Sequence, residues 1–148
     1  MTTYKIDGFA SNLERREKYR DFYATGVIAK GDALCFDVNA TEPTNGYGNH
    51  VMEADIDAVA TSCAIGIATE AATAGDKVRV QVAGYCDFAQ TVSASAAPGD
   101  LLGTNTAAGQ LSIIAAHPQL AVAIHIADST VGTGDASSKV FLLNPANL

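Results

Sequence analysis

A short Gly-Asp phrase recurs three times in this chain and constrains its fold more than any other feature. Each copy has a small residue, any residue, Gly-Asp and an apolar residue two positions later, at 29–34, 73–78 and 97–102. Glycine adopts positive φ without a Cβ clash, and an aspartate side chain bonds nearby backbone amides. Each phrase therefore predicts a tight turn that leads into a strand, with turn residues Gly31, Asp32, Gly75, Asp76, Gly99 and Asp100.

A second pattern relates two longer segments. Ala-Ile-Gly-Ile-Ala at 64–68 and Ala-Ile-His-Ile-Ala at 123–127 each precede a Gly-Asp pair, and the matched positions lie 59 residues apart without a gap. The second of these pairs, Gly134 and Asp135, is predicted to be a further turn. Because this spacing exceeds the usual period of a solenoid, it favours two related β-units within one domain.

Alternating apolar residues predict the strands between the turns. Val78, Val80 and Val82 alternate with polar residues, which places the valines on one face of a strand. Segment 41–50 is predicted to be a long loop, and the pattern over 51–60 is ambiguous, with spacing that also suits a helical turn. We expect an all-β fold, a small β-barrel or β-sandwich, with further strands near 33–38, 63–69, 84–92, 101–103, 111–114, 122–126 and 139–143.

Length and composition favour one domain without covalent or metal staples. A chain of 148 residues with 48% hydrophobic residues can bury a core unaided. The three cysteines are widely spaced and form no C-x-x-C pair, so we expect buried free thiols. No apolar leader and no stretch of about 20 apolar residues occurs, which predicts synthesis in the cytoplasm and no membrane partner.

The first 24 residues differ from the rest of the chain. They hold five of the nine Lys and Arg residues and five of the ten Phe and Tyr residues. We therefore expect an N-terminal arm over 1–24 and a β-rich domain over 25–148. Ser11 and Glu14 fit a capping box, which predicts a short helix near 12–22. The acidic remainder of the chain disfavours binding to nucleic acid and favours a protein partner.

The arm carries the candidate contact residues. Aromatic side chains interleaved with arginines concentrate binding energy at protein interfaces. The alternative is that the same aromatic residues pack on the protein's own body, and the sequence leaves both open. The candidates for contact with a partner or a neighbouring subunit are Tyr4, Phe9, Arg15, Arg16, Tyr19, Phe22 and Tyr23.

The sequence predicts no catalytic, cofactor or metal site. His50 and Glu53 could lie on one helical face, but no second histidine or thiolate pair completes a zinc site. There is no G-x-S-x-G elbow, and Gly46-x-Gly48 lacks the strand-to-helix context of a phosphate loop. The Gly-Asp aspartates stand almost alone, whereas a calcium loop concentrates several oxygens.

Segment 64–103, with Gly66-Ile67-Ala68 and the phrases at 73–80 and 97–102, resembles the capsid decoration, or cement, proteins of tailed bacteriophages. The resemblance covers 26–36 in part. It implies a small β-barrel or β-sandwich, often a homotrimer, on the outer surface of an expanded capsid. There it would bind the major capsid protein and bridge neighbouring subunits. The resemblance implies no catalytic residues.

Two other functions are weighed against this one. A receptor- or carbohydrate-binding module of a phage fibre or head appendage would use Tyr47, Tyr85 and polar loop groups, although the chain has no Trp. A small hydrolase would rest only on scattered His, Asp and Cys residues. The capsid-binding hypothesis accounts for more of the chain than either alternative.

Overall fold

The computed structural model describes residues 16–38, 48–55, 63–92, 96–114, 121–129 and 137–143. Within these ranges the protein is all-β without a helix, which confirms the predicted class. The strands form one mixed sheet in the order β1-β3-β2-β4-β5-β9-β8-β6-β7. Their bounds are β1 Lys18–Ala24, β2 Ala33–Phe36, β3 His50–Glu53, β4 Gly66–Ala68, β5 Lys77–Gln90, β6 Leu101–Thr104, β7 Leu111–Ile113, β8 Ala123–Ser129 and β9 Ser137–Leu142.

The first five strands pair into a closed ring. β1 pairs with β3, β3 with β2, β2 with β4, β4 with β5, and β5 returns to β1. The side chains that point into this ring form an apolar cluster that includes Leu34, Val51, Val78 and Val80. A closed ring leaves no edge strand with unpaired backbone groups.

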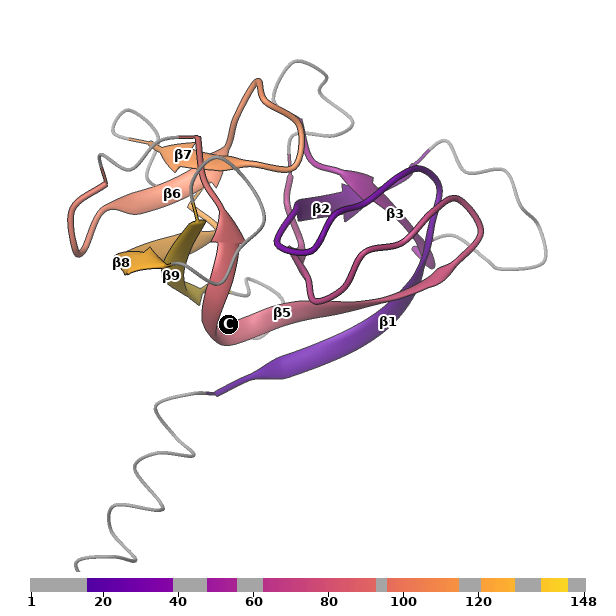
Figure 1. The fold of residues 1–148 in the computed structure, drawn as a ribbon, viewed down its shortest axis with the longest axis horizontal. Coiled ribbons are helices and arrows are strands. Elements are labelled where there is room, and N and C mark those ends of the chain that lie inside the picture. The colour runs from indigo at the N-terminus through magenta and orange to yellow at the C-terminus, as the bar shows by residue number, and fades with distance from the viewer. Residues whose placement is uncertain are drawn as a thin grey trace, which may run out of the picture.

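The long strand β5 belongs to two groups of strands, as Figure 1 shows. Its second half pairs with β9, and β9, β8, β6 and β7 follow in order. A parallel bridge from Thr91 to Leu111 brings β7 back to the end of β5. We call β1–β4 with residues 77–83 unit 1, and residues 84–90 with β6–β9 unit 2.

The two units repeat the same strand pairings in the same register. In each unit the first strand lies parallel to the third, and every other pairing is antiparallel. The first strand of unit 1 is β1, and its equivalent in unit 2 is the second half of β5. Three residue pairs of unit 1 have an equivalent pair in unit 2. Phe36–Val51 corresponds to Thr104–Leu111, Tyr23–Lys77 corresponds to Gln90–Ser137, and Ala33–Ile67 corresponds to Leu101–Ile124.

This repeat corresponds to the 59-residue sequence pattern, with a different register. Ile67 pairs with Ala33 as Ile124 pairs with Leu101, so the structurally equivalent residues lie 57 positions apart. β8 contains a register shift between His125 and Ala127. This β-bulge follows the matched pairs, so the two-residue difference between the sequence match and the structural match is already present before it.

One apolar cluster joins the two units. It combines residues such as Ala33, Cys35 and Ile67 from unit 1 with Leu102 and Val140 from unit 2. These unit 1 side chains point away from the interior of their own ring, because their neighbours along the strands, such as Leu34 and Ala68, line it. The units therefore pack as one body rather than as separate domains.

Two sequence predictions are wrong in detail, and one segment that the sequence left ambiguous is resolved. The helix expected near 12–22 is replaced over 18–22 by strand β1, whose backbone hydrogen bonds go to β5 instead of within a helix; residues 12–15 lie outside the described ranges. Segment 51–60, whose sequence pattern is ambiguous, begins within strand β3. Cys35 and Cys86 are buried as expected, whereas Cys63 is exposed.

Candidate functional site

The three Gly-Asp phrases form one kind of turn. Gly31, Gly75 and Gly99 have φ values of 95°, 89° and 94°. In the 73–76 turn, Asp76 N–H donates to the Thr73 carbonyl at 3.0 Å, and Asp76 Oδ2 accepts the Thr73 N–H at 3.0 Å. Positive φ only at the third position is the geometry of a type II turn. The other two turns repeat both bonds, so all three are confirmed as structural turns.

A fourth turn of this kind has glutamine where the others have aspartate. Gln110 N–H donates to the Ala107 carbonyl at 3.2 Å, and Gly109 has φ of 76°. The Gly-Asp phrase does not include this turn. The signal that could have predicted it is the glycine at 109 with an apolar residue, Leu111, two positions later. Gly134 and Asp135 lie outside the described residues.

The structure places the candidate arm residues in two environments. Tyr19 and Tyr23 are 40% and 37% exposed on the outer face of β1. Phe22 points to the other face, where it packs against the interior of unit 1 and meets the Phe36 ring edge-to-face at 5.8 Å. Phe22 therefore packs on the protein's own body, whereas Tyr19 and Tyr23 are exposed on the opposite face of the same strand. Tyr4, Phe9 and Arg15 lie outside the described residues.

Basic side chains gather where β1 begins. Arg16, Lys18 and Arg20 are all exposed. No described carboxylate forms an ion pair with any of the three, although the whole protein carries a net charge of −7. Arg16 is also the one non-glycine residue of the described ranges with positive φ, at 43°. This basic segment, 16–20, has the opposite charge to the body that carries it.

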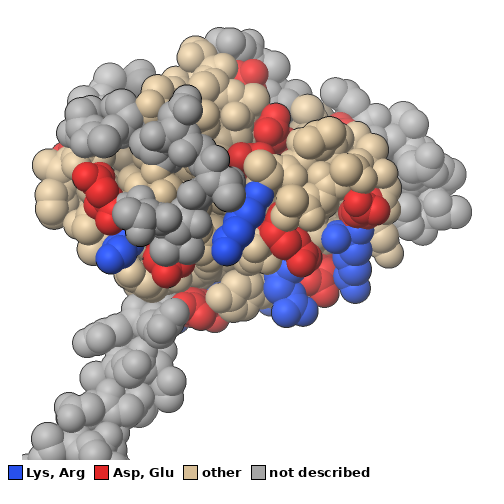
Figure 2. All heavy atoms as spheres, viewed as in Figure 1, with Lys and Arg blue, Asp and Glu red and all other residues tan. Residues whose placement is uncertain are grey.

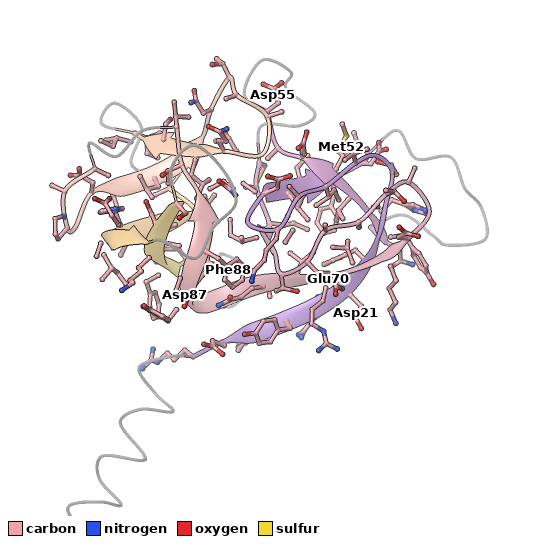
Figure 3. All side chains as sticks on the ribbon, in the orientation of Figure 1. Asp21, Met52, Asp55, Glu70, Asp87 and Phe88 are labelled. Atoms are coloured by element: carbon pink, nitrogen blue, oxygen red, sulfur yellow. The ribbon has the colours of Figure 1, made fainter. Side chains whose placement is uncertain are left out.

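The neighbouring charges are paired. Asp21 lies 3.2 Å from Arg79 Nε and 3.5 Å from Lys77 Nζ, and the hydrogen bond from Arg79 is the main cause that lowers the Asp21 pKa. Glu70 accepts the Arg79 backbone N–H at 3.2 Å. Figure 2 shows Lys and Arg mixed with Asp and Glu along this lower side, and Figure 3 shows Asp21 and Glu70 beside β1 and β5.

A carboxyl pair, with Asp32 buried and Glu53 half-buried, lies where the two units meet. The Asp32 side chain is almost fully buried and hydrogen bonds with the Glu53 carboxyl. Burial and the neighbouring Asp32 raise the pKa of Glu53 to about 7, and burial also raises the pKa of Asp32. The hydrogen bond itself raises the pKa of Glu53 and lowers that of Asp32, so the protonated Glu53 carboxyl is the donor and Asp32 the acceptor. The sequence did not reveal this pair, because Glu53 lies on a strand 21 positions from Asp32.

No metal centre is assembled from the residues that the structure describes. In these ranges no group of three or more His, Cys, Asp and Glu residues could hold a metal ion. His50 and Glu53 are the two ends of a strand rather than neighbours on a helix. Burial raises the pKa of the Cys35 and Cys86 thiols to about 11 and about 12, which keeps both thiols protonated.

The described residues contain no helix that is both long enough and apolar enough to span a bilayer. No protein-family model matches this chain, and no curated protein matches it either. The proposed function therefore rests on the exposed basic segment and on the Gly-Asp turns.

Proposed function

We propose that this protein is a structural component of a phage particle that binds the outer surface of the expanded capsid. Bound there, it stabilises the shell by bridging neighbouring copies of the major capsid protein. The observation that carries the proposal is the exposed basic segment 16–20 on an acidic body. The resemblance of the Gly-Asp phrases to decoration proteins supports the same function.

The geometry of β1 suits an attachment point. Its ladder with β5 holds the strand in the sheet, so Lys18 and Arg20 are presented from a rigid element. Binding through a rigid element loses less conformational entropy than binding through a free coil. Exposed cations at the rim of an interface raise the association rate with an acidic surface and make that rate sensitive to salt.

The test uses purified protein and expanded heads that lack it. We expect saturable co-sedimentation with the heads, and heads that survive heating better when the protein is bound. Changing Arg16 and Lys18 together to Ser should weaken binding about tenfold, which corresponds to ~1.4 kcal/mol. Lys139→Ser, which changes a cation on β9, is the control and should bind normally.

A truncation tests the arm separately. The deletion must end at residue 17, because β1 is part of the sheet and its loss would open the ring of unit 1. The truncated protein should fold and bind heads more weakly than the full chain. Full-chain protein that binds no expanded head of its own virus would rule out the proposed function.

A further inference from the structure

The face by which unit 1 packs on unit 2 is a row of side chains in register. Ala33 on β2 lies opposite Ile67 on β4, which lies opposite Gln81 on β5. All three are at most 1% exposed. They point away from the interior of their own ring and toward unit 2: Ala33 and Ile67 belong to the cluster that joins the units, and Gln81 Nε2 donates to the Tyr85 carbonyl at 2.7 Å.

The cover consists of the second half of β5 and the fourth turn. Gln90 N–H donates to the Gly31 carbonyl at 2.9 Å, and Gln90 Nε2 donates to the Lys30 carbonyl at 3.2 Å. Lys30 Nζ lies 5.0 Å from the centre of the Phe88 ring, which Figure 3 labels on β5. The Ala33 N–H donates to the Gly109 carbonyl at 2.7 Å.

Unit 2 carries the equivalent row, and no described segment covers it as the second half of β5 covers the row of unit 1. Leu101 lies opposite Ile124, and Ile124 lies opposite Phe141, by the same pairings as in unit 1. All three side chains are partly exposed, and Ile126 beside them is 38% exposed. The row is also more apolar than its buried counterpart, since Leu replaces Ala and Phe replaces Gln. Burial of Leu101, Ile124 and Phe141 would therefore remove more apolar surface from water than burial of the row on unit 1 does.

Strand β1 of unit 1 is the equivalent of the second half of β5, which covers the row of unit 1, and the outer face of β1 is exposed. β1 corresponds to the second half of β5, and Tyr23 occupies the position of Gln90, as the pairs Tyr23–Lys77 and Gln90–Ser137 show. Its outer face presents Tyr19 and Tyr23 to solvent. Exposed Asn49 lies alongside and accepts the Tyr23 N–H at 2.8 Å.

We propose that the chain associates with a second copy of itself head to tail, with the Leu101–Ile124–Phe141 row of one copy against the outer face of β1 of the next. This contact repeats between chains the side-chain packing that joins unit 1 to unit 2 within a chain, without the Gln90–Gly31 backbone bond, because the Tyr23 N–H already binds the Asn49 carbonyl. The two surfaces differ, so the contact is heterologous. Repeated contacts of this kind close into a ring or continue as a chain, according to the rotation between copies.

The association is tested on the purified full-length chain by light scattering after size exclusion. Wild-type protein should be larger than a monomer. Ile124→Asp should disrupt the row, and Tyr23→Asp the β1 face, and each change should weaken association more than tenfold. Val27→Asp places the same charge at a residue that is 75% exposed and belongs to neither surface, so it should associate like wild type.

Mixing the two variants distinguishes this contact from others. Each variant keeps the surface that the other has lost, so the mixture should form a heterodimer with one copy of each and nothing larger. A symmetric contact between two identical rows would instead leave Tyr23→Asp fully associated. Monomeric wild-type protein, or a mixture that stays monomeric, would overturn the proposal.

A cross-linking experiment avoids dependence on variants that could fail to fold. In a Cys63→Ser background, which removes the exposed native thiol, Ile124→Cys and Tyr23→Cys chains are mixed and oxidised. A disulfide between the two different chains should exceed that between identical chains. Equal amounts of all the cross-linked pairs would contradict a head-to-tail contact. Neither experiment involves capsids, so its outcome is independent of the proposed function.

Discussion

The carboxyl groups of Asp32 and Glu53 share a hydrogen bond at the junction of the two units. Asp32 belongs to the first Gly-Asp turn, where its Oδ2 also accepts the Ala29 N–H at 2.7 Å. A glycine is required at position 109, because a Cβ there would lie 2.9 Å from Asp32 Cγ. The first turn, strand β3 and the fourth turn therefore meet around the Asp32 carboxyl group.

This pair predicts that stability falls as the pH rises. The folded protein holds the Glu53 proton up to about pH 7, whereas an unfolded chain releases it near the ordinary value of 4.5. The folded state binds more protons in that window, so the free energy of unfolding decreases from pH 4.5 through about pH 7. Glu53→Gln should remove this part of the pH dependence and raise the melting temperature above that of wild type at alkaline pH.

Thermal melts over that pH range provide the measurement. Glu70→Gln changes an exposed carboxylate by the same chemistry and should leave the wild-type profile in place. A Glu53→Gln profile parallel to that of wild type would show that the pair does not titrate in this window.

Two glycines with the same backbone geometry should respond differently to alanine. A Cβ at Gly75 meets nothing within 4 Å, whereas a Cβ at Gly31 would lie 2.3 Å from the Phe88 carbonyl oxygen. Gly75→Ala should cost about 1 kcal/mol for positive φ alone. Gly31→Ala should cost roughly 2–4 kcal/mol, because displacement of β5 adds to the same φ penalty.

Urea unfolding of both variants measures the difference directly. Gly31 and Gly75 have similar φ values, so the additional loss of unfolding free energy in Gly31→Ala reports how tightly the first turn packs on unit 2. Equal losses in the two variants would mean that the contact between the units yields without cost.

The Gln81 side chain should stabilise the backbone of β5 around Gly84, where the two halves of the strand meet. The side chain is 1% exposed, and Nε2 donates to the carbonyls of Ala83 at 3.2 Å and Tyr85 at 2.7 Å. These carbonyls flank Gly84, which has φ of 90°. Gln81→Met keeps the length of the side chain but leaves both carbonyls without this donor, at a cost of about 1–3 kcal/mol. Chemical denaturation measures the loss, and an unchanged midpoint would contradict it.

His125 should be replaceable with a gain in stability. It is 2% exposed, and neither ring nitrogen has a hydrogen-bond partner among the described residues. The Asp128 carboxylate lies 3.6 Å from Nε2, which is too far for a hydrogen bond. The equivalent residue of unit 1 is Ala68, since each accepts the N–H of a turn glycine. His125→Leu removes two unsatisfied polar atoms from the interior and should stabilise the fold by about 1 kcal/mol.

The matched comparison is His125→Asn, which keeps polar atoms at the site. It should be less stable than the leucine variant in the same thermal melts. If the leucine variant is the less stable of the two, the imidazole makes a compensating interaction inside unit 2.

The strands that the sequence predicted are those with strong local signals. Val78, Val80 and Val82 line the interior as their alternation indicated, but Gln81 breaks the polar-outside pattern because unit 2 covers it. Strand β1 was mistaken for a helix, since the capping box is a local signal and the ladder with β5 is not. The arm was expected to end at residue 24, yet residues 18–24 pair within the sheet.

The sequence by itself determined the turns, the all-β class and the segregation of charge. These depend on local properties: glycine alone tolerates positive φ at little cost, and alternation of apolar residues places them on one face. Only the tertiary structure decided that Asp32 meets Glu53, that one row of side chains is covered, and that its equivalent on unit 2 is exposed. Those facts depend on which strands pair across long separations and on how one unit packs on the other, and no local pattern encodes either.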